Sequence, residues 1–259
     1  MFLNESIIRE RLNKNLTDLQ IYIYNSIDST NTRAKNTAEN TDVGNAVFIA
    51  CEQTAGRGRM GRSFASGADK GLYMSILLKN GAAAEEGLLV TTYMATVAAD
   101  VIGKISGISP KIKWVNDIYS SGKKLSGILT EGKINPDGTL LYCVCGIGIN
   151  LRKQAFPEEI AAIATTLEDE CGVAHDVNEL AAELINEFFA NLHLVGSKTV
   201  ADKYRSLSLV IGEEITVTKA TESYDATVVD ITDKCELVIL KKNGEGEILS
   251  TGEVSIRKK

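Results

Sequence analysis

The amino-acid sequence predicts an α+β protein in two parts, a large domain over residues 1–208 and a small all-β domain over residues 209–259. Three observations support this prediction. The length of 259 residues suits one large domain, or one large and one small domain. Helical and extended patterns follow one another up to about residue 208. After Val210 the pattern changes to short alternating strands separated by glycines, which is typical of a small barrel.

The first part of the chain alternates helices and strands. Apolar residues fall on one side of Glu5–Lys14, as in a helix, and Ile21–Tyr24 is rich in β-branched and aromatic residues, as in a strand. The polar cluster Ser29-Thr30-Asn31 offers N-caps for a helix over Arg33–Glu39. Further elements are expected as strands over Ala46–Cys51 and Leu72–Leu78, a loop rich in Gly and Arg over Thr54–Lys70, and the longest helix over Glu85–Ile105.

The remaining elements are a hairpin, a run of helices and the small domain. The hairpin turn is Asn135-Pro136-Asp137-Gly138, a strong turn sequence between two apolar runs. The large domain adds strands over Lys111–Trp114, Lys124–Lys133 and Leu140–Ile149, then helices over Glu158–Ala164, Thr166–Cys171, Val177–Leu194 and Lys198–Leu207. The small domain has strands over Glu214–Lys219, Tyr224–Asp230, Glu236–Leu240, Glu247–Ser250 and Val254–Arg257.

The charge balance limits the classes of partner. The chain carries 28 basic and 34 acidic residues, a net charge of −6, so it is not expected to bind nucleic acid over its whole surface. An acidic total is compatible with a local cluster of cations around a small anion. The start of the sequence lacks the basic and apolar regions of a signal peptide, and no run of about 18 apolar residues predicts a membrane span.

Cysteine and histidine usage indicates a cytoplasmic protein without a zinc centre. The five cysteines form no C-x-x-C pair, so all are expected as reduced thiols. Cys143 and Cys145 alternate and are expected to pack on one face of a strand. His175 and His193 have no ligand-like cluster around them, which excludes a histidine-rich zinc site and disfavours a histidine-based triad.

The most informative segment is Gln53-Thr54-Ala55-Gly56-Arg57-Gly58-Arg59-Met60-Gly61-Arg62, where three arginines alternate with glycines. Glycine allows close backbone approach and arginine offers forked donors, so this Arg-Gly loop suits a carboxylate or phosphate. The glycines also fit G-x-G-x-x-G, but a Rossmann fingerprint needs a helix directly afterwards, and Ser63–Lys70 is another loop. An RNA-binding loop is disfavoured because a basic total and interleaved aromatics are lacking.

Three further segments are weak when taken singly. Lys113-Trp114-Val115-Asn116-Asp117 is compatible with a turn, and Lys124 at the start of an apolar strand is compatible with an ordinary surface lysine. In Gly146-Ile147-Gly148-Ile149-Asn150-Leu151, two glycines alternate on one face of a strand. Glycine inside a strand is costly unless something packs closely on it, so a nearby backbone or a flat ligand is expected there.

In their order and spacing, these segments resemble the biotin–protein ligase family, and the Arg-Gly loop is highly specific to it. The similarity covers nearly the whole chain from about residue 20. The segments that carry it are Ser29-Thr30-Asn31, Gln53–Arg62, Lys113–Asp117, Lys124–Leu129, Gly148-Ile149-Asn150 and the closing Gly252–Arg257. The resemblance implies a class II synthetase-like catalytic domain with a mixed sheet, followed by a small SH3-like β-barrel.

The resemblance also implies an activity and its substrates. Enzymes of the family adenylate biotin with Mg-ATP, release pyrophosphate, and pass the biotinyl group to one lysine of the apo biotin carboxyl carrier protein. The implied biotin-binding residues are Ser29, Thr30, Asn31, Gln53, Arg57, Gly58, Arg59 and Lys124. The implied nucleotide-binding residues are Arg57, Arg59, Arg62, Phe64, Asn116, Gly127, Asn150 and Arg257.

Three residues are implied in the chemistry itself. Lys124 would hold the biotin carboxylate and then the acyl-phosphate oxygens, and Arg59 would neutralise phosphoryl charge. Asp117, the one acid in these motifs, is assigned to Mg²⁺ or to the incoming acceptor lysine. Gly127 and Gly148 are expected to give room for the adenylate. Because water would hydrolyse the mixed anhydride, the Arg-Gly loop is expected to act as a lid.

The sequence departs from the family pattern at two positions. Val115 stands where Lys-Trp-Pro-Asn-Asp is common, which removes the fixed φ of proline. Phe64 stands where relatives often carry tryptophan, which keeps an apolar contact without the indole donor. Neither change is expected to abolish the activity.

Three alternatives belong to other classes. The first is a ligase for lipoate or another acid, and the second is a non-catalytic biotin-binding module. The third is a DNA-binding regulator, since some family members carry an N-terminal winged helix of roughly fifty to sixty residues. Only 28 residues precede Ser29, so DNA binding is not expected. The oligomeric state is left open between monomer and homodimer, and no membrane partner is expected.

Overall fold

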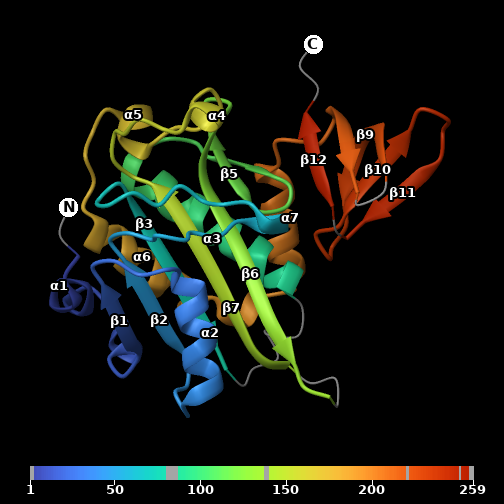
Figure 1. Ribbon diagram of the computed structural model, residues 1–259. Helices are drawn as coiled ribbons and strands as arrows, with labels where there is room; N and C mark the ends of the chain where they lie inside the picture. Colours follow the sequence, from blue (N-terminus) through green and yellow to red (C-terminus); the bar gives the residue numbers. More distant parts are fainter. Residues whose placement is uncertain (1–2, 80–86, 137–139, 220–221, 251, 257–259) are drawn as a thin grey trace.

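The computed structural model describes residues 3–79, 87–136, 140–219, 222–250 and 252–256. Within them the chain forms two sheets, one of seven strands and one of five (Figure 1). The two sheets share one continuous hydrophobic core, which runs from Ile8 near the N-terminus to Val254 in the last strand. The α+β fold predicted from the sequence is therefore confirmed.

The large sheet is mixed and has the order β1-β2-β3-β7-β6-β5-β4. Only β1 and β2 pair in parallel, and the remaining neighbours are antiparallel. The central strand β7 is buried on both faces. The strands are β1 (Gln20–Tyr24), β2 (Ala46–Ala50), β3 (Gly71–Leu78), β4 (Lys111–Lys113), β5 (Asp117–Ser120), β6 (Lys123–Ile134) and β7 (Leu140–Asn150).

Helices cover the two faces of this sheet unequally (Figure 1). Helix α2 (Thr30–Asn40) packs alone on one face, where Ala34 and Ala38 meet Phe48 of β2. The opposite face is covered by α3 (Gly87–Ser106), α6 (Val177–Ala190) and α7 (Lys198–Leu207). The shorter helical elements are α1 (Glu5–Glu10), α4 (Glu158–Ala161), α5 (Leu167–Cys171) and the single turns η1 (Lys14–Leu16), η2 (Arg59–Gly61) and η4 (Leu192–Leu194).

Helix α3 is long and strongly apolar. Its stretch Leu88–Ser106 is long and apolar enough, by length and composition alone, to cross a membrane, with a mean hydropathy of 1.4. The sequence pattern had not singled out this stretch as a possible span. In the fold, 67% of it is buried against the sheet and neighbouring helices, as expected for the core helix of a globular protein.

Several predicted boundaries shift. The first helix ends at Glu10 instead of Lys14, and the chain continues through η1. The long helix predicted to reach Leu194 ends at Ala190, where Asn191 begins the separate turn η4. Strand β5 was missed entirely, because Asn116-Asp117 has turn-like residues and β5 has only four. The hairpin turn falls partly on residues 137–139, which lie outside the described residues.

The alternating cysteines behave as predicted. Cys143 and Cys145 lie on the same face of β7 and are buried in the core. Burial raises the pKa of the Cys143 thiol to about 12 and that of Cys145 further still. Both therefore stay protonated at neutral pH and pack as small apolar residues.

The small C-terminal sheet is antiparallel, with the order β11-β10-β9-β8-β12, as expected for the SH3-like barrel. Its strands are β8 (Glu214–Thr218), β9 (Ser223–Ile231), β10 (Leu237–Lys241), β11 (Gly246–Leu249) and β12 (Glu253–Ile256). It docks beside α7, which contacts β9 (Figure 1). Two hydrogen bonds help to hold it there. Trp114 Nε1 donates to the Cys235 carbonyl at 2.9 Å in a buried contact, and Arg205 Nε donates to the Ile231 carbonyl at 2.5 Å in a partly buried one.

The tryptophan contact gives a testable prediction about docking. Trp114→Phe removes the donor of the buried Cys235 carbonyl, so the free energy of unfolding is expected to fall by about 1–3 kcal/mol. Urea denaturation measures the change. Val229→Ala, at an exposed position of β9, is the control and is expected to stay within about 0.5 kcal/mol of the unaltered chain. Equal stability of the two variants would contradict the docking role of Trp114.

Candidate active site

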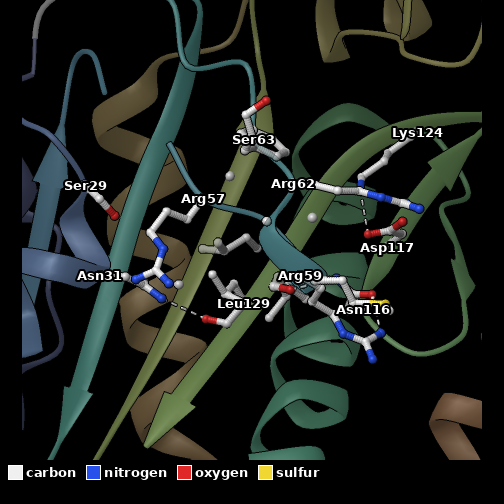
Figure 2. A pocket seen from close by; sticks show the side chains of 18 of the residues that line it. Ser29, Asn31, Arg57, Arg59, Arg62, Ser63, Asn116, Asp117, Lys124 and Leu129 are labelled. Atoms are coloured by element: carbon white, nitrogen blue, oxygen red, sulfur yellow. Dashed lines mark hydrogen bonds and ion pairs between the residues drawn. The ribbon is translucent and has the colours of Figure 1, made fainter. Parts of the chain in front are cut away.

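A pocket opens on the α2 face of the large sheet, between the N-terminus of α2, the Arg-Gly loop, β5, β6 and β7 (Figure 2). Strand β12 of the small sheet also reaches it through Val254. Most of the residues implied by the family resemblance line this one pocket. They are Ser29, Thr30, Asn31, Gln53, Arg57, Gly58, Arg59, Arg62, Phe64, Asn116, Asp117, Lys124 and Gly127.

The neutral end of the pocket is built from the first turn of α2. Ser29 is the N-cap of this helix and accepts from the Thr32 N–H at 3.5 Å. Thr30 donates its backbone N–H to Gln53 Oε1 at 2.9 Å, and Gln53 Nε2 donates to Ser66 Oγ at 3.0 Å. The Ser-Thr-Asn cluster therefore does two things: it starts a helix, and it presents hydroxyl and amide groups to the pocket.

Asn31 is held in place by three strands at once. Its Nδ2 donates to the Leu129 carbonyl of β6 at 3.1 Å, and its Oδ1 lies 2.6 Å from Ser75 Oγ of β3. Between these strands lies Gly146 of β7, where an added Cβ would come within 2.0 Å of Asn31 Oδ1. Close packing at Gly146 is therefore present, but it comes from the Asn31 side chain and not from the nearby backbone or flat ligand that the glycine pattern predicted.

Glu131 contacts Arg57, Lys35 and Asn31 together. One carboxylate oxygen accepts from Lys35 Nζ at 2.7 Å and lies 3.2 Å from an Arg57 guanidinium nitrogen, and the other accepts from Asn31 Nδ2 at 2.9 Å. Burial alone would raise the pKa of Glu131, but the hydrogen bonds from Lys35 and Asn31 and the nearby cations outweigh it, so the pKa is lowered. Glu131 therefore stays ionised at neutral pH.

The Arg-Gly loop has a defined turn at its tip. Gly58 N–H donates to the Arg62 carbonyl at 2.7 Å, and Met60 and Gly61 adopt positive φ values of 53° and 74°. The Arg59 guanidinium donates to Asn116 Oδ1 at 3.2 Å and to the Gly252 carbonyl at 3.2 Å. Arg59 thus links the loop both to the β4–β5 segment and to the small domain.

Phe64 fills the space above two glycines. An added Cβ on Gly148 would lie 2.4 Å from the Phe64 ring, and one on Gly127 would lie 3.4 Å from it. The ring also meets Tyr73 edge to face, with 6.5 Å between centroids. The space expected at Gly127 and Gly148 for the adenylate therefore holds an aromatic ring of the loop in this structure.

Lys124 and Asp117 form an ion pair on the far side of the pocket, with Nζ and Oδ1 2.7 Å apart (Figure 2). A register shift between β5 and β6 brings them together, since Asp117 pairs with Gly127 while Tyr119 pairs with Lys124. The backbone of Lys124 is fixed by hydrogen bonds to Ile163 and Thr165. Lys124 therefore faces the pocket, and the alternative of an ordinary surface lysine is wrong.

The neighbouring segment is held from the opposite side. The peptide bond from Trp114 to Val115 is cis, and the Val115 carbonyl accepts from the buried Tyr204 hydroxyl at 2.9 Å. Asn116 Nδ2 donates to the Ile128 carbonyl at 2.8 Å. These contacts fix Asn116 and Asp117 at the pocket wall despite the missing proline.

In the described part of the chain, no group of three or more His, Cys, Asp or Glu residues is arranged to hold a metal ion. Asp117 is one carboxylate, and it already faces Lys124. Magnesium commonly uses one or two carboxylates together with substrate phosphates. Asp117 therefore fits a magnesium ion that arrives with a nucleotide and does not by itself form a resident metal site.

One predicted residue that the structure describes is not brought to the pocket. Asn150 does not line it; the end of β7 turns its Nδ2 toward the Thr165 carbonyl at 3.1 Å, where it fastens the loop before α5. Arg257 lies outside the described residues. The family pattern had placed Asn150 by sequence order, but its direction depends on packing against that loop.

Two residues that hold the pocket's side chains in place from behind were not predicted. Glu131 follows Gly127 and Leu129 at alternate positions of β6, so its place on the same face could have been inferred from strand period alone. Ser75 is the single polar residue in the apolar run of β3. A buried hydroxyl needs a partner, and this requirement was the signal that Ser75 offered.

Comparison with known proteins places this pocket in a defined class. Residues 23–150 match the model of the biotin/lipoate A/B protein ligase family. Residues 210–257 match the model of the biotin protein ligase C-terminal domain. The resemblance to the biotin–protein ligase family is therefore confirmed. One family match falls on the large sheet and the other on the small sheet.

The individual relatives that the chain resembles are ligases. The chain is 31% identical to the biotin–[acetyl-CoA-carboxylase] ligase of Mycobacterium tuberculosis, over 84% of this chain and 81% of that protein. It is 32% identical to the bifunctional ligase/repressor BirA of Escherichia coli, over 89% of this chain and 72% of that protein. The biotin protein ligase of Aquifex aeolicus, solved with biotin and ATP, has a TM-score of 0.79 and 29% identity, covering 93% of this chain and 99% of that one. The chain belongs to the biotin protein ligase family.

The two strand glycines give a paired prediction. Gly146→Ala is expected to destabilise the chain by about 1–3 kcal/mol, because Asn31 is buried and cannot move away from the new methyl group. For Gly148→Ala, the three atoms nearest to the new methyl group all belong to the Phe64 ring, which lies on a loop and can move, so a smaller loss is expected. Thermal or urea unfolding measures both. A larger loss for Gly148→Ala would contradict this packing.

Proposed function

We propose that this chain joins biotin to ATP, forming biotinyl-5'-adenylate and pyrophosphate, and then transfers the biotinyl group to a lysine of a biotin carboxyl carrier protein. The observation that carries the proposal is the pocket itself. Neutral hydrogen-bonding groups at Thr30 and Gln53 lie at one end, and cationic groups at Arg59 and Lys124 lie at the other. A neutral ring and a carboxylate at its far end match biotin.

The neutral end suits the ureido ring of biotin. Thr30, Asn31 and Gln53 offer hydroxyl and amide groups without net charge, and their positions are fixed by hydrogen bonds. Leu129 and Gly146 line the same end and add an apolar wall. Ser29 stands at the cap of α2 beside them, so we assign these residues to biotin binding.

The cationic end suits the first chemical step. A biotin carboxylate oxygen attacks the α-phosphorus of ATP, a new oxygen–phosphorus bond forms, and the bond to the β-phosphate breaks with pyrophosphate leaving. Two anions must meet for this step, and fixed cations lower its barrier. Arg59, Arg62 and Lys124 line this part of the pocket, and Arg57 lies nearer to Asn31 (Figure 2). We assign Lys124 to the point where the carboxylate and the α-phosphate meet.

The second step needs a group that handles a proton. The amine of the acceptor lysine attacks the acyl carbon, AMP leaves with the bonding electrons, and the amine loses a proton. Asp117 is the carboxylate on this side of the pocket, 2.7 Å from Lys124. We assign it to orienting or deprotonating the incoming amine, and it is also the group that would meet magnesium bound to the nucleotide.

The nucleotide is assigned to the part of the pocket between the loop and β5–β6. Asn116 and Gly127 line this part, and Phe64 offers an aromatic face there. Adenine would stack on or displace the Phe64 ring. Gly58 in the loop allows the backbone to approach the substrates closely.

The partner and the domain division are part of the same proposal. The protein substrate is the apo form of a biotin carboxyl carrier protein, and neither DNA nor a membrane is proposed as a partner. Cytoplasmic location and a monomeric or homodimeric state are likewise expected. A division between residues 208 and 209 is supported by the end of α7 at Leu207 and by the second family match, which begins at residue 210.

The activity is tested by biotin-dependent exchange of pyrophosphate into ATP, followed by avidin detection of labelled apo carrier protein. Lys124→Ala is expected to lose at least about 100-fold in exchange rate, because it removes a fixed cation at the reacting groups. Lys123→Ala, its exposed neighbour outside the pocket, is the matched control and should keep full activity. Lipoate in place of biotin tests the main rival, and faster exchange with lipoate would overturn the assignment.

The lid hypothesis is tested by limited trypsin digestion. The Arg-Gly loop offers three arginine sites at Arg57, Arg59 and Arg62, and Met60 at its tip is exposed. Biotin with Mg-ATP is expected to slow cleavage of the 54–70 segment, because the cations of the loop then contact the bound anions. Equal cleavage with and without the substrates would contradict loop closure.

A further inference from the structure

A chain of hydrogen bonds runs behind the neutral end of the pocket and passes through Ser75, a fully buried residue of β3 that does not line the pocket. Three oxygen–oxygen contacts follow one another. Asn31 Oδ1 lies 2.6 Å from Ser75 Oγ, Ser75 Oγ lies 2.7 Å from Thr30 Oγ1, and Thr30 Oγ1 lies 3.1 Å from Gln53 Oε1. Serine and threonine each carry one hydroxyl proton and amide oxygens carry none, so two protons serve three contacts.

The Asn31 end of the chain has a fixed polarity. The other side of this amide faces two pure acceptors, the Leu129 carbonyl at 3.1 Å and Glu131 Oε2 at 2.9 Å, so that side must be Nδ2. Ionised Glu131 reinforces this orientation. Asn31 Oδ1 therefore faces Ser75 and can only accept. Since two protons serve three contacts, they go to the two shorter ones, of 2.6 and 2.7 Å, and Ser75 donates its only proton to Asn31 Oδ1.

The Gln53 end is fixed in the same way. Its Oε1 accepts the Thr30 backbone N–H at 2.9 Å, so its Nε2 lies on the other side and donates to Ser66 Oγ at 3.0 Å. Ser66 in turn donates to the Phe64 carbonyl at 3.0 Å. Neither end of the chain can reverse without placing two donors or two acceptors together.

The two fixed ends determine the direction of the Thr30 hydroxyl proton. Since Ser75 has given its proton to Asn31, the contact of 2.7 Å between the two hydroxyls must be made by the Thr30 proton. Thr30 Oγ1 and Gln53 Oε1 are then two acceptors 3.1 Å apart with no proton between them. Both residues line the pocket, so a ligand bound there can supply an N–H to this acceptor pair.

We propose that Ser75 is a specificity-determining positioning residue, which orients the Thr30 hydroxyl so that the pocket accepts a hydrogen bond from a ureido N–H and rejects a ligand with an oxygen at that place. The proposal rests on the proposed function, because it names the feature of biotin that the site selects. Ser75 acts only through Thr30 and does not touch the ligand. Without the Ser75 hydroxyl, Thr30 turns its proton toward Gln53 or toward an acceptor on the ligand.

The first test compares biotin with two cyclic carbamate analogues, each with one ureido N–H replaced by a ring oxygen. In the unaltered chain, one of the two analogues is expected to show a kcat/KM for pyrophosphate exchange at least about 100-fold below that of biotin, since a site built for a donor rejects a ligand without it. If kcat/KM for both analogues equalled kcat/KM for biotin, the proposal would be overturned. Failure of biotin itself would remove the proposed function, and this proposal with it.

The second test changes Ser75 itself. Ser75→Ala is expected to reduce the preference for biotin over that analogue by at least about tenfold, because Thr30 can then donate to the ring oxygen. Ser126→Ala is the matched control: Ser126 is equally buried on β6, and its hydroxyl has no hydrogen-bond partner among the described residues. The control should keep the preference of the unaltered chain.

The ratio of kcat/KM for biotin to kcat/KM for the analogue distinguishes a positioning role of Ser75 from a general loss of structure. A merely structural loss lowers kcat/KM for biotin and for the analogue alike and leaves their ratio unchanged, and that outcome would overturn the role of Ser75. Unfolding midpoints of both variants are measured alongside. If Ser75→Ala does not fold, Thr30→Val, which removes the oriented hydroxyl itself, is expected to lower the same ratio at least about tenfold, and an unchanged ratio there counts against the proposal.

Discussion

The site depends on one constraint: the central strand β7 has glycine at two successive positions of the face that it turns toward the pocket, Gly146 and Gly148. Gly146 and Gly148 face α2, while Cys145 and Ile147 fill the core on the other side. The bare backbone at Gly146 lets Asn31 reach β3 and β6 together. The bare backbone at Gly148 lets the loop residue Phe64 lie against the sheet. Any larger residue at these positions would separate α2 and the Arg-Gly loop from the strands that hold their partners.

Much of the site was accessible from the sequence, since its residues stand in short segments with distinctive composition. Arginines among glycines indicated an anion site, and alternating glycines in β7 indicated close packing on one face. What lay on those glycines was not accessible, because Asn31 and Gly146 are distant in the chain and meet only through sheet order. Asn150 illustrates the same limit: its position was known, but its direction is set by the loop near Thr165. Strand β5 was not predicted, because four residues with turn-like neighbours are too few to show the alternating pattern of a strand.

The small sheet takes part in the site as well as in stability. Arg59 of the Arg-Gly loop donates to the Gly252 carbonyl, and Val254 of β12 lines the pocket. Trp114 fastens the same sheet to the segment that carries Asn116 and Asp117. The loop, the β4–β5 segment and the small sheet are therefore mechanically connected, and a change in the position of the small sheet would reach Arg59 directly.

The cations of the pocket are held by internal partners that a ligand can replace. Lys124 faces Asp117, Arg57 faces Glu131, and Arg59 faces the neutral oxygens of Asn116 and Gly252. The charges of Lys124 and Arg57 are thus compensated by carboxylates in a half-buried cleft, where an isolated charge is costly, and Arg59 is hydrogen-bonded to neutral oxygens only. A carboxylate and a phosphate would exchange with these partners instead of adding to them. The neutral acceptor pair at Thr30 and Gln53 differs, since it lacks a proton until the ligand supplies one. At the cationic end, ligand anions would replace the internal partners of the cations, and the reaction takes place there. At the neutral end, the acceptor pair determines which ligand is bound.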